Sequence, residues 1–416
     1  MAEPIEVWLG DRHVGLLTPT QRGATFEFVD DVVASIPNSP LLSTSLPVHG
    51  SKFTAEQTLN WFVGLLPEDR QREEVSRRFN LQGGSYFDML REIGWECAGA
   101  VVIAPAGEGP HPGSLRPLTD ADLGERLTAL PAHPYDDNDA LRISLGGYQA
   151  KMLATRIDDG WFLPMGGAIS THILKPQPAL QWPGLIEAEA WAMTAAARVT
   201  LTADIELLEL AGAPKTLVVT RFDRTTVDGR PTRLHQEDGA QAMGIHPDKK
   251  YAGQPPSKSD PTLRKIAELF DRYADRPADE RRRLLQQVVV NVAVGNTDAH
   301  AKNYGVLHPT EQTITLSPMY DVTPAIVINP ATADMGMRVG ETLVIDRVTS
   351  DKIVDEAMSW GMPRAEAVAV TESALVDLRA GILAATERFP ATSTAVVDAV
   401  TANVERLLDQ VGNPSH

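Results

Sequence analysis

At the start of the chain, apolar and polar positions alternate with the period of two that is typical of half-buried β-strands. The pattern predicts strands at residues 5–9 and 13–17, and the turn residues Gly10-Asp11-Arg12 between them indicate a hairpin. Residues 24–29 alternate in the same way and predict a third strand. The chain is therefore expected to open with a small antiparallel sheet.

Helical periods follow this sheet. Thr54 and Gln57 have the spacing of a capping box, which predicts a helix that runs on until Pro67. Apolar positions at residues 87–93 predict a second helix, and residues 99–104 return to an apolar strand. The N-terminal region is therefore expected to mix a sheet with short helices.

Residues 105–117 contain four prolines and three glycines, a composition that predicts a linker. Beyond it the pattern is rich in β-strands and then becomes mainly helical after Asp223, apart from short strands near 305–308 and 313–316. The intervening elements are expected as strands at 141–147, 151–157, 160–164, 171–176, 205–209 and 216–222, with a helix at 185–197. We predict three domains with the bounds 1–108, 109–225 and 226–416.

Composition restricts the class of protein. The chain has 416 residues, a formal net charge of −17 and a single cysteine, Cys97, which excludes an internal disulfide and a multi-cysteine zinc site. No apolar run approaches the ~18 residues of a membrane helix, and the first residues lack the features of a secretory signal. We expect a soluble, cytoplasmic protein whose acidity disfavours non-specific binding to nucleic acid.

The most informative segment is 294–303, which follows an apolar helical pattern at 284–294. It places Asp298 and Asn303 five residues apart, the D-x-x-x-x-N spacing with which protein kinases supply a carboxylate for the acceptor hydroxyl and an amide ligand for Mg²⁺. Asp321 lies eighteen residues further on, after a short predicted strand, where kinases place a second metal ligand. The spacing alone is a weak signal, and the order of the pieces makes it stronger.

Two upstream features complete that order. Gly146 and Gly147 lie between strand-like runs and would let backbone N–H groups approach a phosphate, and Lys175 ends a predicted strand. Taken singly, these residues are a hairpin turn and a solvated lysine, and Asp298 with His300 is a capping turn. Asp298 and His300 could also begin a metal site, but the sequence offers no third ligand at a suitable spacing.

The chain resembles HipA-type toxins, which are serine/threonine kinases of bacterial type II toxin–antitoxin modules. The segments that carry the resemblance are RISLGGYQAKML (142–153), THILKPQ (171–177), VVTRFDR (218–224), LHQEDGAQAMGI (234–245), NTDAHAKNYGV (296–306) and LSPMYDVTPA (316–325). Residues 7–17, 45–48 and 62–73 resemble the family's N-terminal subdomain. The resemblance implies an α+β, bilobal, protein-kinase-like fold with a β-rich N-terminal subdomain and a mainly helical C-terminal lobe.

The resemblance also implies roles for individual residues. Asp298 would be the catalytic base, braced by His300, while Asn303 and Asp321 would bind Mg²⁺. The expected ATP-binding residues are Leu145, Gly146, Gly147, Tyr148 and Gln149 in the phosphate loop, Lys175 on the α/β-phosphates, Arg221, Phe222 and Asp223 at the interlobe hinge, and Gln236 beside the nucleotide. Ser144 matches the serine whose autophosphorylation inactivates the kinase, and Glu189 is a candidate partner for Lys175.

The implied cofactors are ATP and Mg²⁺, and the implied partner is a HipB-like helix-turn-helix antitoxin that carries most of the contact with DNA. The expected substrate is a protein serine, with an aminoacyl-tRNA synthetase as the family-level target. The sequence departs from the family pattern at Tyr148, Ala150 and Thr220. The alternatives are a phosphoinositide-type or small-molecule kinase, and a non-catalytic co-repressor that only binds the antitoxin.

Overall fold

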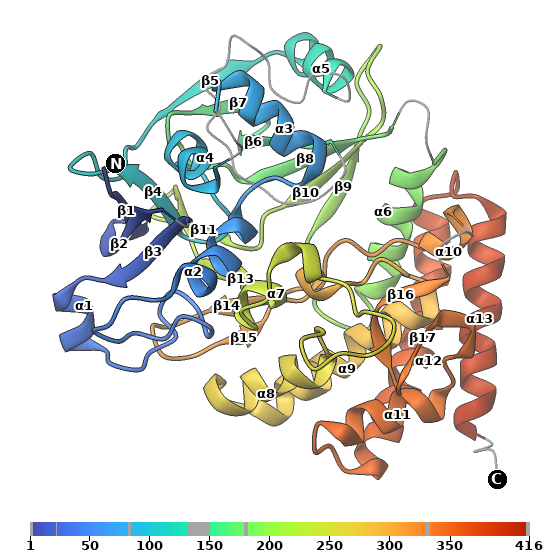
Figure 1. The fold of residues 1–416 in the computed structure, drawn as a ribbon. Helices are drawn as coiled ribbons and strands as arrows, with labels where there is room; N and C mark the ends of the chain where they lie inside the picture. Colours follow the sequence, from blue (N-terminus) through green and yellow to red (C-terminus); the bar gives the residue numbers. More distant parts are fainter. Residues whose placement is uncertain are drawn as a thin grey trace. The chain divides into compact units, whose positions relative to one another are not determined.

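The computed structural model describes residues 3–21, 23–81, 85–130, 150–178, 182–329 and 333–412. The chain forms two compact units (Figure 1). The first contains residues 1–176, 208–247 and 307–313, and the second contains residues 177–207, 248–306 and 314–416. Both helices and sheets are present, as the sequence predicted for the fold class.

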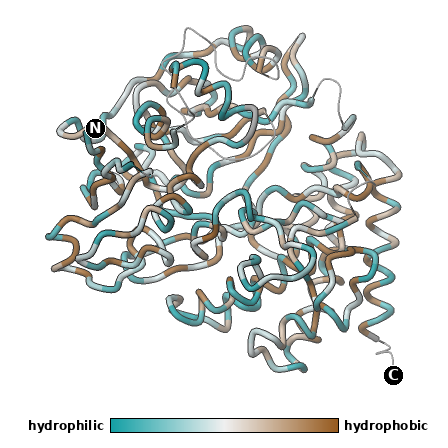
Figure 2. Tube along the Cα trace, in the orientation of Figure 1, coloured by the Kyte–Doolittle hydropathy of each residue, from teal (hydrophilic) through white to brown (hydrophobic). Residues whose placement is uncertain are grey.

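The first unit begins with an antiparallel sheet of order β3-β2-β1-β4. Its strands are β1 (Ile5–Leu9), β2 (Arg12–Thr20), β3 (Gly23–Phe28) and β4 (Val101–Pro105). Ile5 lies opposite Leu17, so the predicted hairpin is confirmed. Buried and partly exposed residues alternate along β3, which lets one face of the sheet pack into a core (Figure 2).

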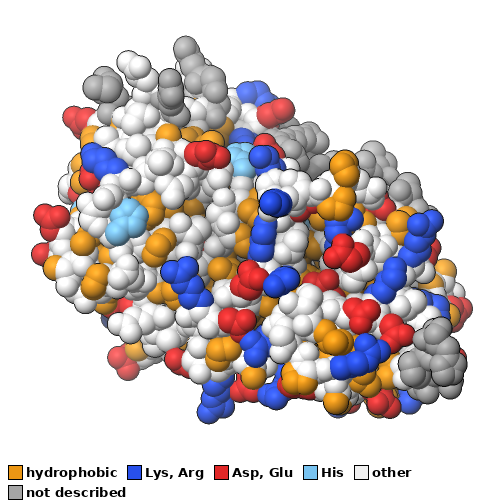
Figure 3. Space-filling model, turned by 60° about the horizontal axis from the view of Figure 1, so that its bottom comes forward, with side chains coloured by type: hydrophobic (Ala, Val, Ile, Leu, Met, Phe, Trp, Pro, Cys, Tyr) orange, Lys and Arg blue, Asp and Glu red, His pale blue; other side chains and the backbone are white. Residues whose placement is uncertain are grey.

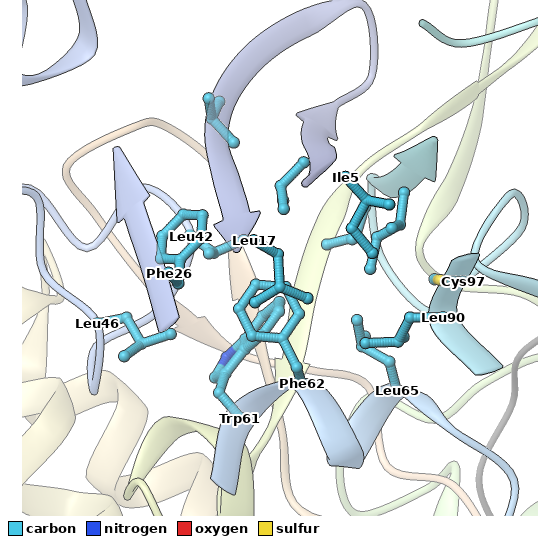
Figure 4. Packing of buried hydrophobic residues seen from close by; sticks show 14 of the residues in the cluster. Ile5, Leu17, Phe26, Leu42, Leu46, Trp61, Phe62, Leu65, Leu90 and Cys97 are labelled. Carbon is cyan, nitrogen blue, oxygen red and sulfur yellow. The ribbon is translucent and has the colours of Figure 1, made fainter. Parts of the chain in front are cut away.

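Short helices cover this sheet. They are α1 (Asp30–Ser35), α2 (Ala55–Phe62), α3 (Asp69–Arg78) and α4 (Tyr86–Ile93), with the 3₁₀ turn η1 (Val63–Leu65) after α2. The capping box of Thr54 and Gln57 is confirmed at the start of α2. The shared core contains Phe26, Trp61 and Phe62, each fully buried (Figure 4). The pattern did not predict α3.

Five of the six strands of a second sheet lie in this unit, in the order β5-β7-β6-β8-β10. Its strands are β5 (Ser114–Leu118), β7 (Gly160–Met165), β6 (Met152–Ile157), β8 (His172–Pro176) and β10 (Thr216–Thr220), and α5 (Asp120–Ala129) packs near its edge. The linker prediction for residues 105–117 is wrong at its C-terminal end, because β5 pairs with β7 from Ser114 onward. Proline is tolerated in β5 because β5 is an edge strand.

The rest of the first unit is also more β-rich than predicted. After Asp223 the chain forms the hairpin β11 (Arg224–Val227) and β12 (Arg230–Arg233), and then β13 (His235–Asp238) and the short helix α7 (Gly239–Ala242). The expectation of a mainly helical chain after Asp223 is therefore wrong for this stretch. β11 and β12 are mostly polar, and they lack the apolar alternation that signals a strand.

The second unit is mainly helical. Its helices are α6 (Leu185–Ala196), α8 (Leu263–Tyr273), α9 (Pro277–Val294), α10 (Ala325–Ile328), α11 (Ser350–Ser359), α12 (Arg364–Arg388) and α13 (Thr394–Gly412), with 3₁₀ turns η3 (Pro247–Lys249), η4 (Ala301–Asn303) and η5 (Ile345–Arg347). It also contains β15 (Thr315–Leu316), β16 (Asp334–Val339) and β17 (Thr342–Val344), and the last two pair as an unpredicted hairpin. Strands β9 (Ile205–Leu208) and β14 (Gly305–His308) lie where the chain passes from one unit to the other.

The helices α6 and α12 approach each other very closely at Gly381. A Cβ at this position would lie 2.3 Å from the backbone oxygen of Ala195, so only glycine fits the crossing. On the face drawn in Figure 3, acidic and basic side chains lie among one another. Across the described ranges, no helix is both long and apolar enough to cross a membrane.

Candidate active site

The predicted catalytic loop begins at the end of α9, in the second unit. Gly295 ends this helix in a left-handed conformation, with φ 76°. A Cβ at Gly295 would lie 2.4 Å from Cγ2 of Ile326, so both the backbone conformation and the available space require glycine. The buried C-terminal half of α9 therefore gives the loop a rigid starting point.

Asp298 lies on this loop and is exposed. Its carboxylate oxygen Oδ1 accepts a hydrogen bond from the hydroxyl of Tyr251 at 2.6 Å. Its backbone oxygen accepts from the backbone N–H of His300 at 2.7 Å. The carboxylate is thus held at the surface of the unit, where a protein substrate could reach it.

Asn303, in contrast, is only 8% exposed. Its Nδ2 donates to the backbone oxygen of Asp298 at 3.2 Å. Because the oxygen and nitrogen of an amide point in different directions, this bond orients the amide oxygen of Asn303 away from that carbonyl. The two ends of the D-x-x-x-x-N spacing are therefore in direct contact.

Asp321 is tied to the same loop by its neighbours. The hydroxyl of Tyr320 donates to the backbone oxygen of Lys302 at 2.6 Å, and Nδ2 of Asn296 donates to the backbone oxygen of Asp321 at 3.2 Å. Asp321 itself has φ 59°, an unusual backbone conformation for a residue other than glycine. Such strain is concentrated at functional sites, and it agrees with a specific role for Asp321.

The side chains of Asn303 and Asp321 offer an amide oxygen and a carboxylate, the hard oxygen ligands that Mg²⁺ prefers. Among the described residues, no group of three or more His, Cys, Asp or Glu side chains could hold a metal ion. An amide oxygen and a carboxylate suit a cation that takes its other ligands from phosphate oxygens and water. The residues present therefore fit Mg²⁺ bound together with a nucleotide.

His300 is 7% exposed, and its ring packs edge-on against Tyr251, with ring centroids 5.0 Å apart and an interplanar angle of 81°. Gly336 of β16 lies directly against its backbone, since a Cβ there would be 2.6 Å from the backbone nitrogen of His300. These contacts are compatible with the predicted bracing role of His300.

Lys175 belongs to the first unit and lies in β8, opposite Leu217 of β10. The sequence alone made a solvated strand end its most ordinary interpretation. The residue is instead only 8% exposed. A buried lysine next to the end of a central strand is well placed for a charged ligand, and the role on the α/β-phosphates stays a prediction.

The predicted phosphate loop, Leu145, Gly146, Gly147, Tyr148 and Gln149, lies outside the residues that the structure describes, and so does Ser144.

The hinge segment contributes to a buried cluster of charges in the first unit. Arg221 donates two hydrogen bonds to Asp223, at 2.9 and 2.7 Å, and its Nη1 donates to Glu96 at 3.2 Å. Arg224 and Arg233 bind the same Glu96 at 2.9 and 2.6 Å. We call Glu96, Arg221, Asp223, Arg224 and Arg233 the charge cluster.

The charge cluster changes what the hinge residues can do. Arg221 and Asp223 are 3% and 4% exposed, and the guanidinium of Arg221 binds both Asp223 and Glu96. The nearby Phe222 is partly exposed. The predicted contacts with adenine and ribose therefore stay predictions that fit Phe222 or the backbone better than the charged side chains.

Gln236 lies on β13 and is partly exposed, while its neighbour Glu237 is completely buried. Glu237 accepts hydrogen bonds from Ser43 Oγ at 2.5 Å, from Trp61 Nε1 at 2.9 Å and from the backbone N–H of Thr44 at 3.0 Å. This carboxylate joins β13 to α2 and to the segment that precedes it. The nucleotide contact of Gln236 stays a prediction.

Sequence reasoning missed Tyr251, Glu96 and Glu237. Glu237 lies in the segment 234–245 that carries the family resemblance. Because His235 and Glu237 are two residues apart on one strand, they share a face, and this could have indicated that both are buried. Glu96 and Tyr251 carry no comparable signal, because their partners lie 125 and 47 residues away along the chain.

Comparison with known proteins agrees with this geometry. The model of the HipA N-terminal domain matches residues 5–104, and the model of the HipA-like C-terminal domain matches residues 143–382. The Sinorhizobium fredii protein Y4mE, whose name describes a kinase, is 34% identical over 356 residues and 83% of each chain. The serine/threonine-protein kinase toxin HipA of Shewanella oneidensis is 26% identical over 377 residues, which are 86% of this chain and 84% of that one.

A solved structure of the Shewanella oneidensis HipA, HipB and operator DNA complex contains a chain that superposes with a TM-score of 0.81 at 23% identity. The superposition covers 98% of this chain and 96% of the other, so the predicted α+β, HipA-like fold is confirmed. The C-terminal family model alone matches more than half of the chain. The chain therefore belongs to the HipA family of serine/threonine protein kinases.

Proposed function

We propose that the protein is the toxin of a type II toxin–antitoxin pair and transfers the γ-phosphate of ATP to a serine of another protein. The observation that carries this proposal is the set of hydrogen bonds by which Asn303, Tyr320 and the backbone of Asp321 contact the loop of Asp298 in the second unit. The target class that we propose is an aminoacyl-tRNA synthetase, so that phosphorylation would inhibit translation. The proposed place of action is the cytoplasm.

The transfer assigns one task to each residue. Asp298 orients the serine hydroxyl and takes its proton as the serine oxygen bonds to the γ-phosphorus and the bond to the oxygen of the departing ADP breaks. Asn303 and Asp321 hold the cation, and Lys175 pairs with the α/β-phosphates. Bound Mg²⁺ supplies positive charge that offsets the charge developing on the phosphates.

The proposal includes a partner protein, of the kind with which a structural relative was solved. The structural relative was solved with HipB and operator DNA. We propose a HipB-like helix-turn-helix antitoxin for this chain as well, with most of the contact to DNA made by the antitoxin. The formal charge of −17 supports that division, because an acidic protein is repelled by the phosphates of DNA.

The proposal is tested with Asp298→Asn, which keeps the shape of the side chain and removes its ability to take a proton. We expect the wild type to gain one phosphate when it is incubated with Mg²⁺ and ATP, at Ser144, and Asp298→Asn to gain none. Intact-mass spectrometry with peptide mapping measures both. Asp275→Asn, an exposed aspartate elsewhere in the same unit, should behave like the wild type.

Expression in cells tests the toxic role. The wild type should arrest growth, Asp298→Asn should not, and co-expression of the antitoxin should restore growth. Growth arrest by Asp298→Asn would favour the non-catalytic co-repressor. Phosphate transfer to phosphoinositide vesicles or to a small molecule, without transfer to protein, would favour the other kinase classes.

A further inference from the structure

The hydroxyl of Tyr251 occupies a position that the proposed mechanism does not use. It donates to Oδ1 of Asp298 at 2.6 Å, which is a short bond to a charged acceptor. Tyr251 lies on the segment between η3 and α8, which the sequence did not associate with any site. The contact lies wholly within the second unit.

The backbone on both sides of Tyr251 is held by the catalytic loop and its support. On one side, the backbone oxygen of Lys250 accepts from the N–H of Ala301 at 3.1 Å. On the other side, the N–H of Ala252 donates to the backbone oxygen of Gly336 at 2.8 Å. Both bonds restrict the position of Tyr251 relative to the loop.

Gly336 closes this arrangement. Its own N–H donates to the backbone oxygen of Thr297 at 2.8 Å, immediately before Asp298. The ring of Tyr251 packs edge-on against His300, two residues beyond Asp298. The position of Tyr251 is thus restricted by the backbone hydrogen bonds of its neighbours and by the contact of its ring with His300. Its hydroxyl bonds one oxygen of the Asp298 carboxylate.

We propose that Tyr251 is a positioning residue that sets the orientation of the Asp298 carboxylate for phosphoryl transfer. With Oδ1 held by the phenol, the direction of Oδ2 is set, and a serine hydroxyl is received in one geometry. Pre-oriented catalytic groups increase the rate because little reorganisation is needed during the reaction. This inference rests on the proposed function, in which Asp298 is the residue that receives the acceptor hydroxyl.

A rival interpretation makes Tyr251 a plug that occupies the place of the acceptor hydroxyl. The two interpretations predict opposite effects of removing the hydroxyl. A plug would have to move aside in each turnover, whereas the backbone bonds at Lys250 and Ala252 hold the segment in place. The structure therefore favours positioning.

The test uses Tyr251→Phe, which removes the hydroxyl and keeps the ring against His300. We expect kcat for protein phosphorylation to fall about tenfold, which corresponds to one lost hydrogen bond of about 1.4 kcal/mol, while KM for ATP changes less than twofold. Tyr273→Phe is the matched control, because the hydroxyl of Tyr273 is buried and makes no hydrogen bond to a described residue. The control should keep the wild-type kcat.

Rescue separates positioning from a general structural effect. Replacement of Tyr251 by 4-aminophenylalanine, which restores an N–H donor at the same place, should recover a large part of kcat. An unchanged or increased kcat in Tyr251→Phe would overturn the inference. A lowered kcat that comes with a lowered melting temperature and is not rescued by 4-aminophenylalanine would overturn it as well.

A second readout does not depend on activity. Crystal structures of the wild type and Tyr251→Phe should show one orientation of the Asp298 carboxylate in the former and more than one in the latter. If the wild type transfers no phosphate, the proposed function fails, and the structures still report whether Tyr251 orients Asp298. An Asp298 carboxylate that is equally ordered in both proteins would overturn the inference by itself.

Discussion

Glu96 is a single buried carboxylate that faces three guanidinium groups in the charge cluster. Burial alone would raise its pKa, but the attraction of Arg224, Arg233 and Arg221 outweighs burial and lowers the pKa to about 2. The neighbouring Cys97 shows the opposite effect, since burial and the adjacent Glu96 raise the pKa of its thiol to about 12. Cys97 is therefore kept as an unreactive thiol.

At this scale we predict that Glu96→Gln lowers the free energy of unfolding at pH 7 by about 3 kcal/mol, because it leaves buried guanidinium groups without their compensating charge. The pH dependence follows from the lowered pKa of Glu96. Its contribution is complete above about 4.5, the ordinary pKa, and is lost as the pH falls towards about 2.

Urea unfolding measured from pH 7 down to pH 2 checks this prediction. The difference between the wild type and Glu96→Gln should shrink across that window. Glu125→Gln, which changes an exposed glutamate of α5, should leave the curve unchanged. A constant difference at every pH would contradict the assigned role of the charge.

At the scale of elements, the C-terminal end of α9, which leads into the catalytic loop, is bound by a side chain of α13. Nδ2 of Asn403, in α13, donates to the backbone oxygens of Val292 and Ala293 at 3.0 and 2.9 Å. Both carbonyls belong to the last turn of α9, and the one of Val292 also accepts from the backbone N–H of Gly295 at 3.2 Å. One side chain of a distant helix thus completes the end of α9.

We predict that Asn403→Asp destabilises the protein by about 2 kcal/mol, because a carboxylate cannot donate and its charge is unfavourable at the C-terminal end of a helix. Thermal unfolding of the two proteins measures the effect. Gln410→Glu on the same helix is the control, because its side-chain oxygen accepts from the N–H of Ser350 and a carboxylate can do the same. Equal stability of Asn403→Asp and the wild type would contradict the capping role.

Elements whose local pattern is strong were predictable from the sequence. The β1–β2 hairpin, the capping box of α2 and the apolar end of α9 follow from residues that are close together in the chain. β5 was misinterpreted because proline and glycine dominate its surroundings, although an edge strand accepts proline. Composition indicates which conformation a segment prefers locally, and it does not indicate which strand will pair with that segment.

In the candidate site, too, the features that are local in the chain were predictable and the contacts between remote residues were not. The spacing of Asp298 and Asn303 is local, so the sequence could indicate it, and the structure adds the bond between them. The burial of Arg221 and the contact of Tyr251 with Asp298 depend on partners that are remote in the chain. Such pairings are created only by folding, and residue type alone does not predict them.

At the scale of the whole molecule, the two units are interwoven along the chain. Each unit is built from three segments, so the chain passes from one unit to the other five times. The first unit takes Glu237 and His308 from late segments, and Glu237 accepts hydrogen bonds from Ser43 and Trp61 and contacts the ring of His308. A single cut in the chain therefore does not release an intact unit.

We predict that a fragment of residues 1–225 does not fold cooperatively. It lacks Arg233 and Glu237, so Glu96 loses a partner and the buried Ser43 and Trp61 lose their shared acceptor. Near-ultraviolet circular dichroism and urea unfolding, with the intact chain as the control, measure this. A sharp unfolding transition of the fragment would contradict the prediction.

The charge cluster also limits how the protein can change during evolution. Glu96 comes from the region that matches the HipA N-terminal domain, and its three arginines come from the region that matches the C-terminal domain. A gene rearrangement that exchanged one region for that of a distant relative would pair a buried carboxylate with unsuited neighbours. We therefore expect the two regions to be inherited together, with the four positions exchanged only as a set.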